Sequence, residues 1–428
     1  MTVSDEPTAA GPTRADRRAR AAVSAMFLTN GALFANLLPR YPEIKGALDL
    51  SNTVYGLMVV AFPAGAMLSG LAAAAIIRRF GSAGVAVGGT ILTALAMVGV
   101  GFAPSLALVA LALFLGGACD AVTDVGQNAH GLRVQRRYGR SVFNSFHALW
   151  SAGAVIGGGM AAAAIALDLP LGVHLTISGS VFCLVALTAY RFRLPGLDAE
   201  VRASDDAAAS ARAAERTAPA DGVTDGAVTD VPAPGPRRGR VGLLLAAFAV
   251  VAIAGAIIED GANAWAALYL SGSLGAAGAV AATGFVAFMA MEFLGRATGD
   301  RFVDRFGQAA VARAGGVLVT VAMGLALAFP SVPTTIVGFA LAGFGVATVI
   351  PAAMHAADEL PGLRAGTGLA VVSWLLRLGF LLMPPVIGIV ADATSLRAAL
   401  LVLPVAGIAV VVAGAMLPGR RRPGTIDA

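Results

Sequence analysis

Charge is scarce in this sequence. Asp, Glu, Lys and Arg make up 13% of its 428 residues, and hydrophobic residues make up 57%. Together with a mean hydropathy of +0.80, this composition excludes an ordinary soluble domain, because a soluble core needs far less apolar sequence. Cysteine is scarce too: Cys119 and Cys183 have no metal-like spacing, which excludes a disulfide scaffold and a cysteine metal site. We expect both cysteines to pack inside membrane spans.

Motifs of nucleotide-driven and enzymatic chemistry are absent from the sequence. No G-x-x-x-x-G-K-[ST] loop is present, and no segment between spans has room for a soluble ATPase domain, which argues against primary transport. No Ser-His-Asp, metal-binding or paired-carboxylate arrangement stands in an enzyme context. A net charge of +5 would suggest nucleic acid in a soluble protein, but here the arginines lie at membrane borders. The sequence therefore predicts no enzyme, no cofactor, no metal ion and no nucleic-acid partner.

Long apolar runs are what the sequence has instead. Their length is typical of membrane-spanning helices, and their Ala, Leu and Gly richness without period-two alternation favours helices over strands. The predicted fold class is an all-α membrane protein with twelve transmembrane helices in two pseudo-symmetric six-helix halves. The expected spans are roughly 20–40, 52–77, 82–103, 105–131, 141–167, 171–190, 241–270, 276–299, 308–329, 334–356, 365–391 and 397–417.

Arginine marks every second loop, which fixes the expected orientation. Lys and Arg collect on the cytoplasmic side of a membrane protein, whereas the alternate loops here hold only Lys45, Arg397 and the border residue Arg40. We therefore expect a multi-pass protein of the cytoplasmic membrane with both termini cytoplasmic. The first apolar run follows a basic segment, as in a secretory signal, but it is long and eleven spans follow, so we interpret it as an uncleaved helix. The cytoplasmic arginines are Arg14, Arg17, Arg18, Arg20, Arg78, Arg79, Arg133, Arg136, Arg137, Arg140, Arg301, Arg305, Arg420, Arg421 and Arg422.

The middle of the chain has a different composition. Between Arg191 and Arg240 the sequence is rich in Asp, Ala, Arg, Pro and Gly with almost no aromatic residue, which predicts a flexible linker between two halves. The halves also echo each other at an offset of 226 positions, because Arg79-Phe80-Gly81 returns as Arg305-Phe306-Gly307, Gly117 as Gly343 and Gly153 as Gly379. The expected segments are a tail at 1–19, a bundle at 20–190, a linker at 191–240, a bundle at 241–417 and a tail at 418–428.

The stretch GRATGDRFVDRFG, residues 295–307, concentrates five charges between apolar flanks. One interpretation is ordinary positive-inside charge at a tight turn whose glycines let two helices come close. The other is a latch, in which Asp300 pairs with arginine or caps a helix N-terminus and lets go when the halves rock. The residues expected at this cytoplasmic gate are Arg78, Arg79, Glu292, Arg296, Gly299, Asp300, Arg301, Asp304 and Arg305; Glu292 and Arg296 are spaced to pair within one helix.

Twelve spans in two halves, the central linker and GRATGDRFVDRFG resemble the major facilitator superfamily, whose members carry G-x-x-x-D-R-type loops at this place and between spans two and three. The first copy here, LSGLAAAAIIRRFG, has Ala74 where the acidic residue would align. Within the superfamily, DVGQNAHGLRVQRRYGRSVFNSFHALWSAGAVIGG and IEDGANAWAALYL look most like the branch that contains fucose-permease-like carriers and their uncharacterised relatives. The resemblance implies the major facilitator fold and alternating-access transport.

Polar residues inside spans indicate where a site lies, because a charge near the bilayer centre costs several kcal/mol and lines a cavity or finds a partner. Asp120 and Asp124 share one helix face, and His147 lies at matching depth on the next span, so these three are the candidates for proton coupling. The alternative is a fixed structural contact between spans four and five. The substrate-cavity candidates are Asn30, Asn36, Gln127, Asn128, Asn144, Trp150, Glu259, Asp260, Asn263, Trp265, Trp374 and Arg377.

Arg377 has the strongest case in that set. Its guanidinium stays charged at mid-membrane and needs an anion, for which Glu259, Asp260 and a bound substrate are the choices. The three tryptophans have two interpretations, stacking on a ligand ring or packing in the bundle. His130, His174 and His355 lie near interfaces or span ends, so we expect them to take no part.

The leading hypothesis is secondary active transport of a small solute by alternating access, coupled to protons as a symporter or antiporter, with a sugar-like solute as one candidate. The first alternative is a proton-driven exporter of drugs or amphipathic metabolites. The second is a non-transporting membrane receptor or scaffold, which fits poorly with so many intramembrane polar residues. The expected partners are a small-molecule substrate, protons and the lipid bilayer, and one twelve-helix chain is expected to function as a monomer.

Overall fold

The computed structural model describes residues 12–70, 72–138, 142–196, 238–364 and 366–418, and within them every regular element is helical. Twelve of the helices are long and apolar enough to cross a membrane, which confirms the predicted all-α membrane fold. Most of the predicted linker and of both predicted tails lies outside the described residues, so that division of the chain stays a prediction. The side chain of Asn144 also lies outside the described part.

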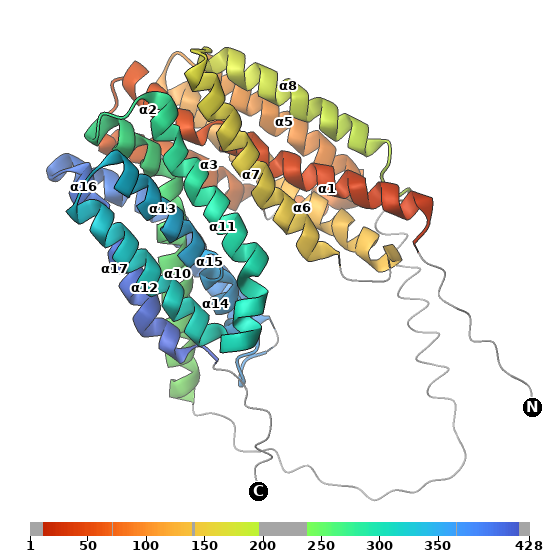
Figure 1. The fold of residues 1–428 in the computed structure, drawn as a ribbon. Coiled ribbons are helices and arrows are strands. Elements are labelled where there is room, and N and C mark those ends of the chain that lie inside the picture. The colour runs from red at the N-terminus through yellow and green to blue at the C-terminus, as the bar shows by residue number, and fades with distance from the viewer. Residues whose placement is uncertain (1–11, 71, 139–141, 197–237, 365, 419–428) are drawn as a thin grey trace, which may run out of the picture. The chain divides into compact units, whose positions relative to one another are not determined.

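The chain forms two compact units, and Figure 1 colours it by residue number from red at the N-terminus to blue at the C-terminus. The first unit comprises residues up to Leu37 together with Ala64–Pro195. Its helices are α1 (Arg14–Ala35), the second part of α3 (Asn52–Ser69), α4 (Ala73–Phe80), α5 (Ser82–Phe102), α6 (Leu106–Tyr138), α7 (Phe143–Ala166) and α8 (Leu171–Tyr190).

The second unit comprises Leu38–Pro63 together with the residues from Gly196 onward. It therefore includes the end of span one and the start of span two, which the sequence analysis places in the first half. Its helices are η1 (Leu38–Arg40), α2 (Tyr41–Ala47), the first part of α3, α10 (Arg238–Leu268), η2 (Tyr269–Ser273), α11 (Gly278–Phe306), α12 (Gln308–Ala328), α13 (Val332–Val346), α14 (Val349–Asp358), α15 (Thr367–Ala393), α16 (Leu396–Ala399), α17 (Val402–Ala413) and η3 (Gly414–Met416).

Glycine sets the distance between α1 and α7 in the first unit. A Cβ atom on Gly153 would lie 2.0 Å from the Leu28 carbonyl oxygen, and one on Gly31 would lie 2.0 Å from the Trp150 carbonyl oxygen. Real Cβ atoms essentially never come within 3.0 Å of such a neighbour, so only glycine allows these backbones to touch. The crossing brings Trp150 of α7 directly beside α1.

Close contacts join the segment Leu38–Pro63 to the rest of the second unit. Gly56 of α3 lies against the Pro384 carbonyl of α15, where a Cβ atom would be 2.3 Å from the oxygen. The hydroxyl of Tyr55 donates to the Ala264 carbonyl of α10. The rings of Tyr55 and Trp265 meet edge to face with centroids 4.9 Å apart. These contacts explain why this segment groups with α10 and α15.

The repeated Arg-Phe-Gly motif has the same structure in both copies. Gly81 ends α4 with φ 75°, and Gly307 ends α11 with φ 85°, a backbone region that favours glycine. In each copy the arginine guanidinium lies over the following phenylalanine ring, at 5.5 Å for Arg79 and 5.4 Å for Arg305. The structure therefore supports the duplicated unit that the offset of 226 positions indicates.

The stretch GRATGDRFVDRFG differs from the expected tight turn. Residues 295–306 are the last turns of α11, and only Gly307 makes the turn into α12. Its two inner glycines serve helix packing instead, because Cβ atoms on Gly295 and Gly299 would lie 2.6 Å from Ala347 and 2.5 Å from Thr348. The charges of the motif therefore lie along a helix end rather than in a loop.

Candidate functional site

A network of polar side chains joins α1, α6 and α7 inside the first unit. The side-chain amide of Asn30 donates to Asp120 Oδ1 at 2.7 Å. The oxygen of the same amide accepts from Trp150 Nε1 at 2.8 Å and from Gln127 Nε2 at 3.3 Å. Asn30 is 6% exposed and Gln127 is 1% exposed, so the network lies inside the helix bundle. The structure thus brings three of the predicted site residues, Asp120, Gln127 and Trp150, to a fourth, Asn30.

Asp124 lies one turn along α6 from Asp120 and belongs to the same network. Its Oδ1 accepts from Gln127 Nε2 at 3.2 Å and from Asn128 Nδ2 at 2.9 Å. Hydrogen bonds from neutral amides stabilise a carboxylate without neutralising its charge. The pair of carboxyl groups on one helix face is the arrangement that the spacing predicts.

Two predicted residues of the first unit lie differently from the expectation. Asn36 is fully buried, and its side chain bonds to other protein groups. Its amide donates to the Ala32 carbonyl at 2.8 Å, and its Oδ1 is 2.9 Å from His174 Nε2. His147 is exposed and meets the rings of Phe27 and Phe143 edge to face, with centroids 5.2 and 5.0 Å apart. A link between His147 and Asp124 stays a prediction.

In the second unit, Arg296 lies between two carboxyl groups. Its Nη2 contacts Glu292 Oε1 one turn earlier on α11 and Glu259 Oε1 of α10, the latter at 3.3 Å. The Glu292 side chain is 3% exposed, that of Glu259 14% and that of Arg296 33%. The pairing within α11 is confirmed, whereas the contact with Glu259 could not be deduced from the sequence. Glu259 is thus paired with Arg296, where the sequence analysis considered Arg377.

Several buried polar atoms near Asp260 have no hydrogen-bond partner among the described residues. They are Asp260 Oδ2, Asn263 Oδ1, Trp265 Nε1 and the Tyr41 hydroxyl. The Tyr41 ring meets Tyr55 edge to face, with centroids 5.9 Å apart. The set mixes donors with acceptors, and buried groups of this kind are normally satisfied by water or a ligand. Trp265 is fully buried, so its ring has no free face for the stacking that the sequence suggested.

Arg377 is exposed and has no ion pair in the described part of the chain. Pro384 and Gly388 follow Arg377 on α15 by seven and eleven positions. At 3.6 residues per turn, both lie within about 20° of the helix face that carries Arg377. At those positions α15 touches α3, since a Cβ on Gly388 would lie 2.3 Å from the Asn52 carbonyl oxygen. Gly379, on the opposite face, contacts α10. Arg377 therefore projects toward the α3 side, and Trp374, 57% exposed, lies one turn away.

Six of the nine expected gate residues lie on exposed helix ends, whereas Glu292 and Gly299 are buried and Arg296 is partly buried within α11. Arg78 and Arg79 end α4, and Asp300, Arg301, Asp304 and Arg305 lie on the last turns of α11. The structure gives neither aspartate an ion pair within the described ranges, so the latch stays a prediction.

The sequence analysis missed Asp392. Its Oδ1 and Oδ2 accept from the backbone N–H groups of Asn52 and Thr53, at 2.9 and 2.8 Å, at the start of α3. The signal was present, because an acid near the end of one span is suited to cap the N-terminus of another.

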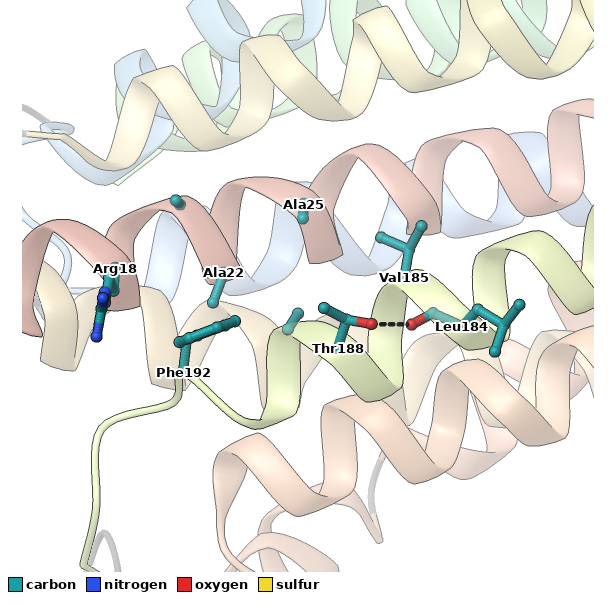
Figure 2. Close-up of a pocket in the computed structure, with 9 residues that line it drawn as sticks. Arg18, Ala22, Ala25, Leu184, Val185, Thr188 and Phe192 are labelled. Atoms are coloured by element: carbon teal, nitrogen blue, oxygen red, sulfur yellow. Dashed lines mark hydrogen bonds between the residues drawn. The ribbon is translucent and has the colours of Figure 1, made fainter.

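A separate apolar pocket of about 500 Å³ lies between α1 and α8. Figure 2 shows Ala22 and Ala25 of α1 facing Leu184 and Val185 of α8, with Arg18 and Phe192 at one end. The Thr188 hydroxyl in the pocket wall donates to the Leu184 carbonyl at 2.7 Å, so its hydrogen is not available to a bound molecule. None of the predicted site residues lines this pocket, and its surface suits a lipid chain better than a polar solute. In the described ranges no group of three or more His, Cys, Asp or Glu residues is placed to hold a metal ion.

Comparison with known sequences finds similarity over both halves of the chain. Residues 15–223 match the family described as transmembrane secretion effector, and residues 243–427 match the family described as Major Facilitator Superfamily. The chain is 29% identical to an uncharacterized transporter, y4wD, of Sinorhizobium fredii, over 88% of this chain and 92% of that protein. It is 27% identical to the membrane protein MosC of Rhizobium meliloti, over 94% of this chain and 90% of that protein.

Solved structures share the fold at low sequence identity. The structure superposes on the nucleoside transporter NupG with a TM-score of 0.68 at 13% identity, covering 94% of this chain and 99% of that one. It superposes on a D-xylose-proton symporter with a TM-score of 0.66 at 12% identity, covering 93% of this chain and 96% of that one. Identities this low show a shared fold and carry no information on substrate.

Proposed function

Because the chain belongs to the major facilitator superfamily and is a membrane transporter rather than an enzyme, we propose that it is a secondary active transporter driven by protons. It moves a small polar solute across the cytoplasmic membrane by alternating access, as a monomer with both termini in the cytoplasm.

The observation that carries the proton coupling is the Asp120 and Asp124 pair. Both carboxyl groups lie within a span and accept hydrogen bonds from the side-chain amides of Asn30, Gln127 and Asn128. A carboxylate held this way is stabilised without losing its charge, whereas removal from water disfavours that charge. Asp124 is therefore suited to gain and lose a proton as water access alternates.

The polar atoms around Asp260 favour a solute rich in hydroxyl groups. The unpartnered Asp260 and Asn263 oxygens accept hydrogen bonds, and the unpartnered Trp265 Nε1–H and Tyr41 hydroxyl donate them. A sugar-like solute offers both kinds of group, which supports the sugar-like candidate. Arg377, which has no ion pair among the described residues, would hold an acidic group if the solute carries one.

The decisive experiment begins with a thermal-shift screen of sugars, organic acids, nucleosides and drugs on the purified protein. With the stabilising solute, we expect Asp124→Asn liposomes to lose proton-driven accumulation and to keep solute exchange, while the matched variant Asp358→Asn, on the exposed end of α14, keeps both. Proton-driven accumulation at the wild-type rate in Asp124→Asn would refute the coupling role. Loss of both activities together would instead favour a fixed structural contact.

A second candidate, a proton-driven exporter, is favoured by one observation. The first half of the chain matches a family described as transmembrane secretion effector. Stabilisation by amphipathic compounds rather than by sugars in the same screen, with outward transport in cells, would select this function.

A further inference from the structure

The Glu259, Glu292 and Arg296 trio lies at the middle of α11, inside a span. Glu292 is fourteen residues from each end of α11, which places it about 21 Å along the helix from either end. Glu259 is fourteen residues before Ser273, where the preceding span ends, so the two carboxyl groups lie at the same depth. Gly343 of α13 fixes this level of α11, since its Cβ would lie 2.2 Å from the Phe288 carbonyl oxygen and 3.2 Å from the Glu292 nitrogen.

The charges of the trio do not balance. Two carboxylates face a single guanidinium, and both contact the same nitrogen atom, Arg296 Nη2. A buried arginine and one carboxylate form a neutral pair, whereas a second ionised carboxylate leaves an uncompensated buried charge that costs several kcal/mol. Asp260 follows Glu259 on α10 and adds a further acid with a buried, unpartnered oxygen.

Among the described residues, the ion pairs that the structure shows bring no cation other than Arg296 to the trio. Within their described residues, α13 and α17 carry no titratable side chain. On α14, His355 pairs with Glu359 at 3.6 Å, beside the helix end that carries Asp358. Arg40 of η1 pairs with Glu43 at 2.7 Å, while Lys45 of α2 donates to the Leu50 carbonyl. On α15, Arg377 projects from the face opposite α10, and Asp392 caps α3. The Tyr41, Tyr55 and Tyr269 hydroxyls near α10 are neutral in their ordinary form.

We propose that Glu259 and Glu292 share one proton beside Arg296, so that the trio is a proton-binding site of this transporter. One carboxylate takes the proton from water to become a carboxylic acid, and the other stays ionised against the guanidinium. Arg296 is 33% exposed, whereas Glu259 is 14% and Glu292 3% exposed, so the arginine is the most accessible member of the trio. A movement of Arg296 away from either carboxylate favours uptake of a second proton, and its return favours release.

The use of this proton in transport rests on the proposed function, but its binding is measurable without a substrate. Full-length protein in lipid is stepped from acid to alkaline pH, and the infrared C=O stretch of protonated carboxylic acids is followed. Apart from any band from Asp120, Asp124 and Asp260, we expect the wild type to keep a band at neutral pH that Glu259→Gln and Glu292→Gln each remove, because the remaining carboxylate then pairs with Arg296. Glu359→Gln, whose side chain is 61% exposed, keeps the band and serves as the control.

Persistence of the band in both glutamine variants would overturn the proposal. Should either variant fail to fold, Arg296→Lys replaces it: this change keeps the charge but alters its position, so the midpoint of the band shifts, and an unmoved midpoint would overturn the proposal equally. Failure of the proposed function has a different signature, since a wild-type protein that accumulates no solute on a proton gradient leaves the band and its loss in the variants unaffected.

Discussion

The close crossing of α1 and α7 makes Gly153→Ala a sharp test of the first unit. The new methyl carbon would lie 2.0 Å from the Leu28 carbonyl oxygen, so the helices must separate by at least 1.0 Å to reach the 3.0 Å limit of real contacts. A shift of that size lengthens the Trp150 to Asn30 hydrogen bond, now 2.8 Å, beyond the range of a hydrogen bond if it acts along that direction. Overpacking of this kind costs about 1–3 kcal/mol.

Gly159→Ala on the same helix is the matched control, because a Cβ atom at Gly159 meets nothing within 4 Å. Both substitutions gain the same helix propensity, about 1 kcal/mol, so the difference between them isolates the contact with α1. Followed by tryptophan fluorescence during heating, Gly153→Ala should melt roughly 2–12 °C below Gly159→Ala. Equal melting temperatures for the two variants would refute the close crossing.

Two further predictions concern α15. In Asp392→Ala the first N–H groups of α3 lose their acceptors, which costs about 1 kcal/mol, so the α3 and α15 contact should open about fivefold more often. That opening is measured by thiol labelling of Ile387→Cys, a position that is 1% exposed, in a background without Cys119 and Cys183. Asp358→Ala is the control, and an unchanged labelling rate in Asp392→Ala would contradict the prediction. Arg377→Ala should lower the affinity for the solute found in the screen while leaving the melting temperature unchanged, since this exposed side chain has no ion pair in the described residues, and normal affinity would remove Arg377 from the site.

The features that sequence predicts well are local ones. Twelve spans follow from apolar length, because the backbone in lipid must satisfy its own hydrogen bonds and the run of apolar residues is the whole signal. The Glu292 and Arg296 pair follows from their spacing within one helix. The shared side of Asp120 and Asp124 on α6 follows for the same reason.

The features that sequence could not predict depend on how each helix is rotated about its axis. Apolar residues cover most faces of a membrane helix, so no amphipathic stripe indicates which side meets a neighbour. Asn30 and Asn36 illustrate this on α1: one joins the network of Asp120, and the other is buried against His174. The contact of Glu259 with Arg296 joins two helices and is invisible in either alone.

The two halves share the Arg-Phe-Gly turn but differ in the acids inside their spans. At the offset of 226 positions that relates the Arg-Phe-Gly turns, Asp120 and Asp124 correspond to Val346 and Ile350. In the other direction, Glu259 and Glu292 correspond to Leu33 and Ala66. An intramembrane acid is costly, so each one is retained where it has its own partners, amides in the first unit and a guanidinium in the second. The two proposed proton sites therefore cannot substitute for one another. The second half has no acid at the positions that correspond to Asp120 and Asp124, and the first half has no acid at the positions that correspond to Glu259 and Glu292.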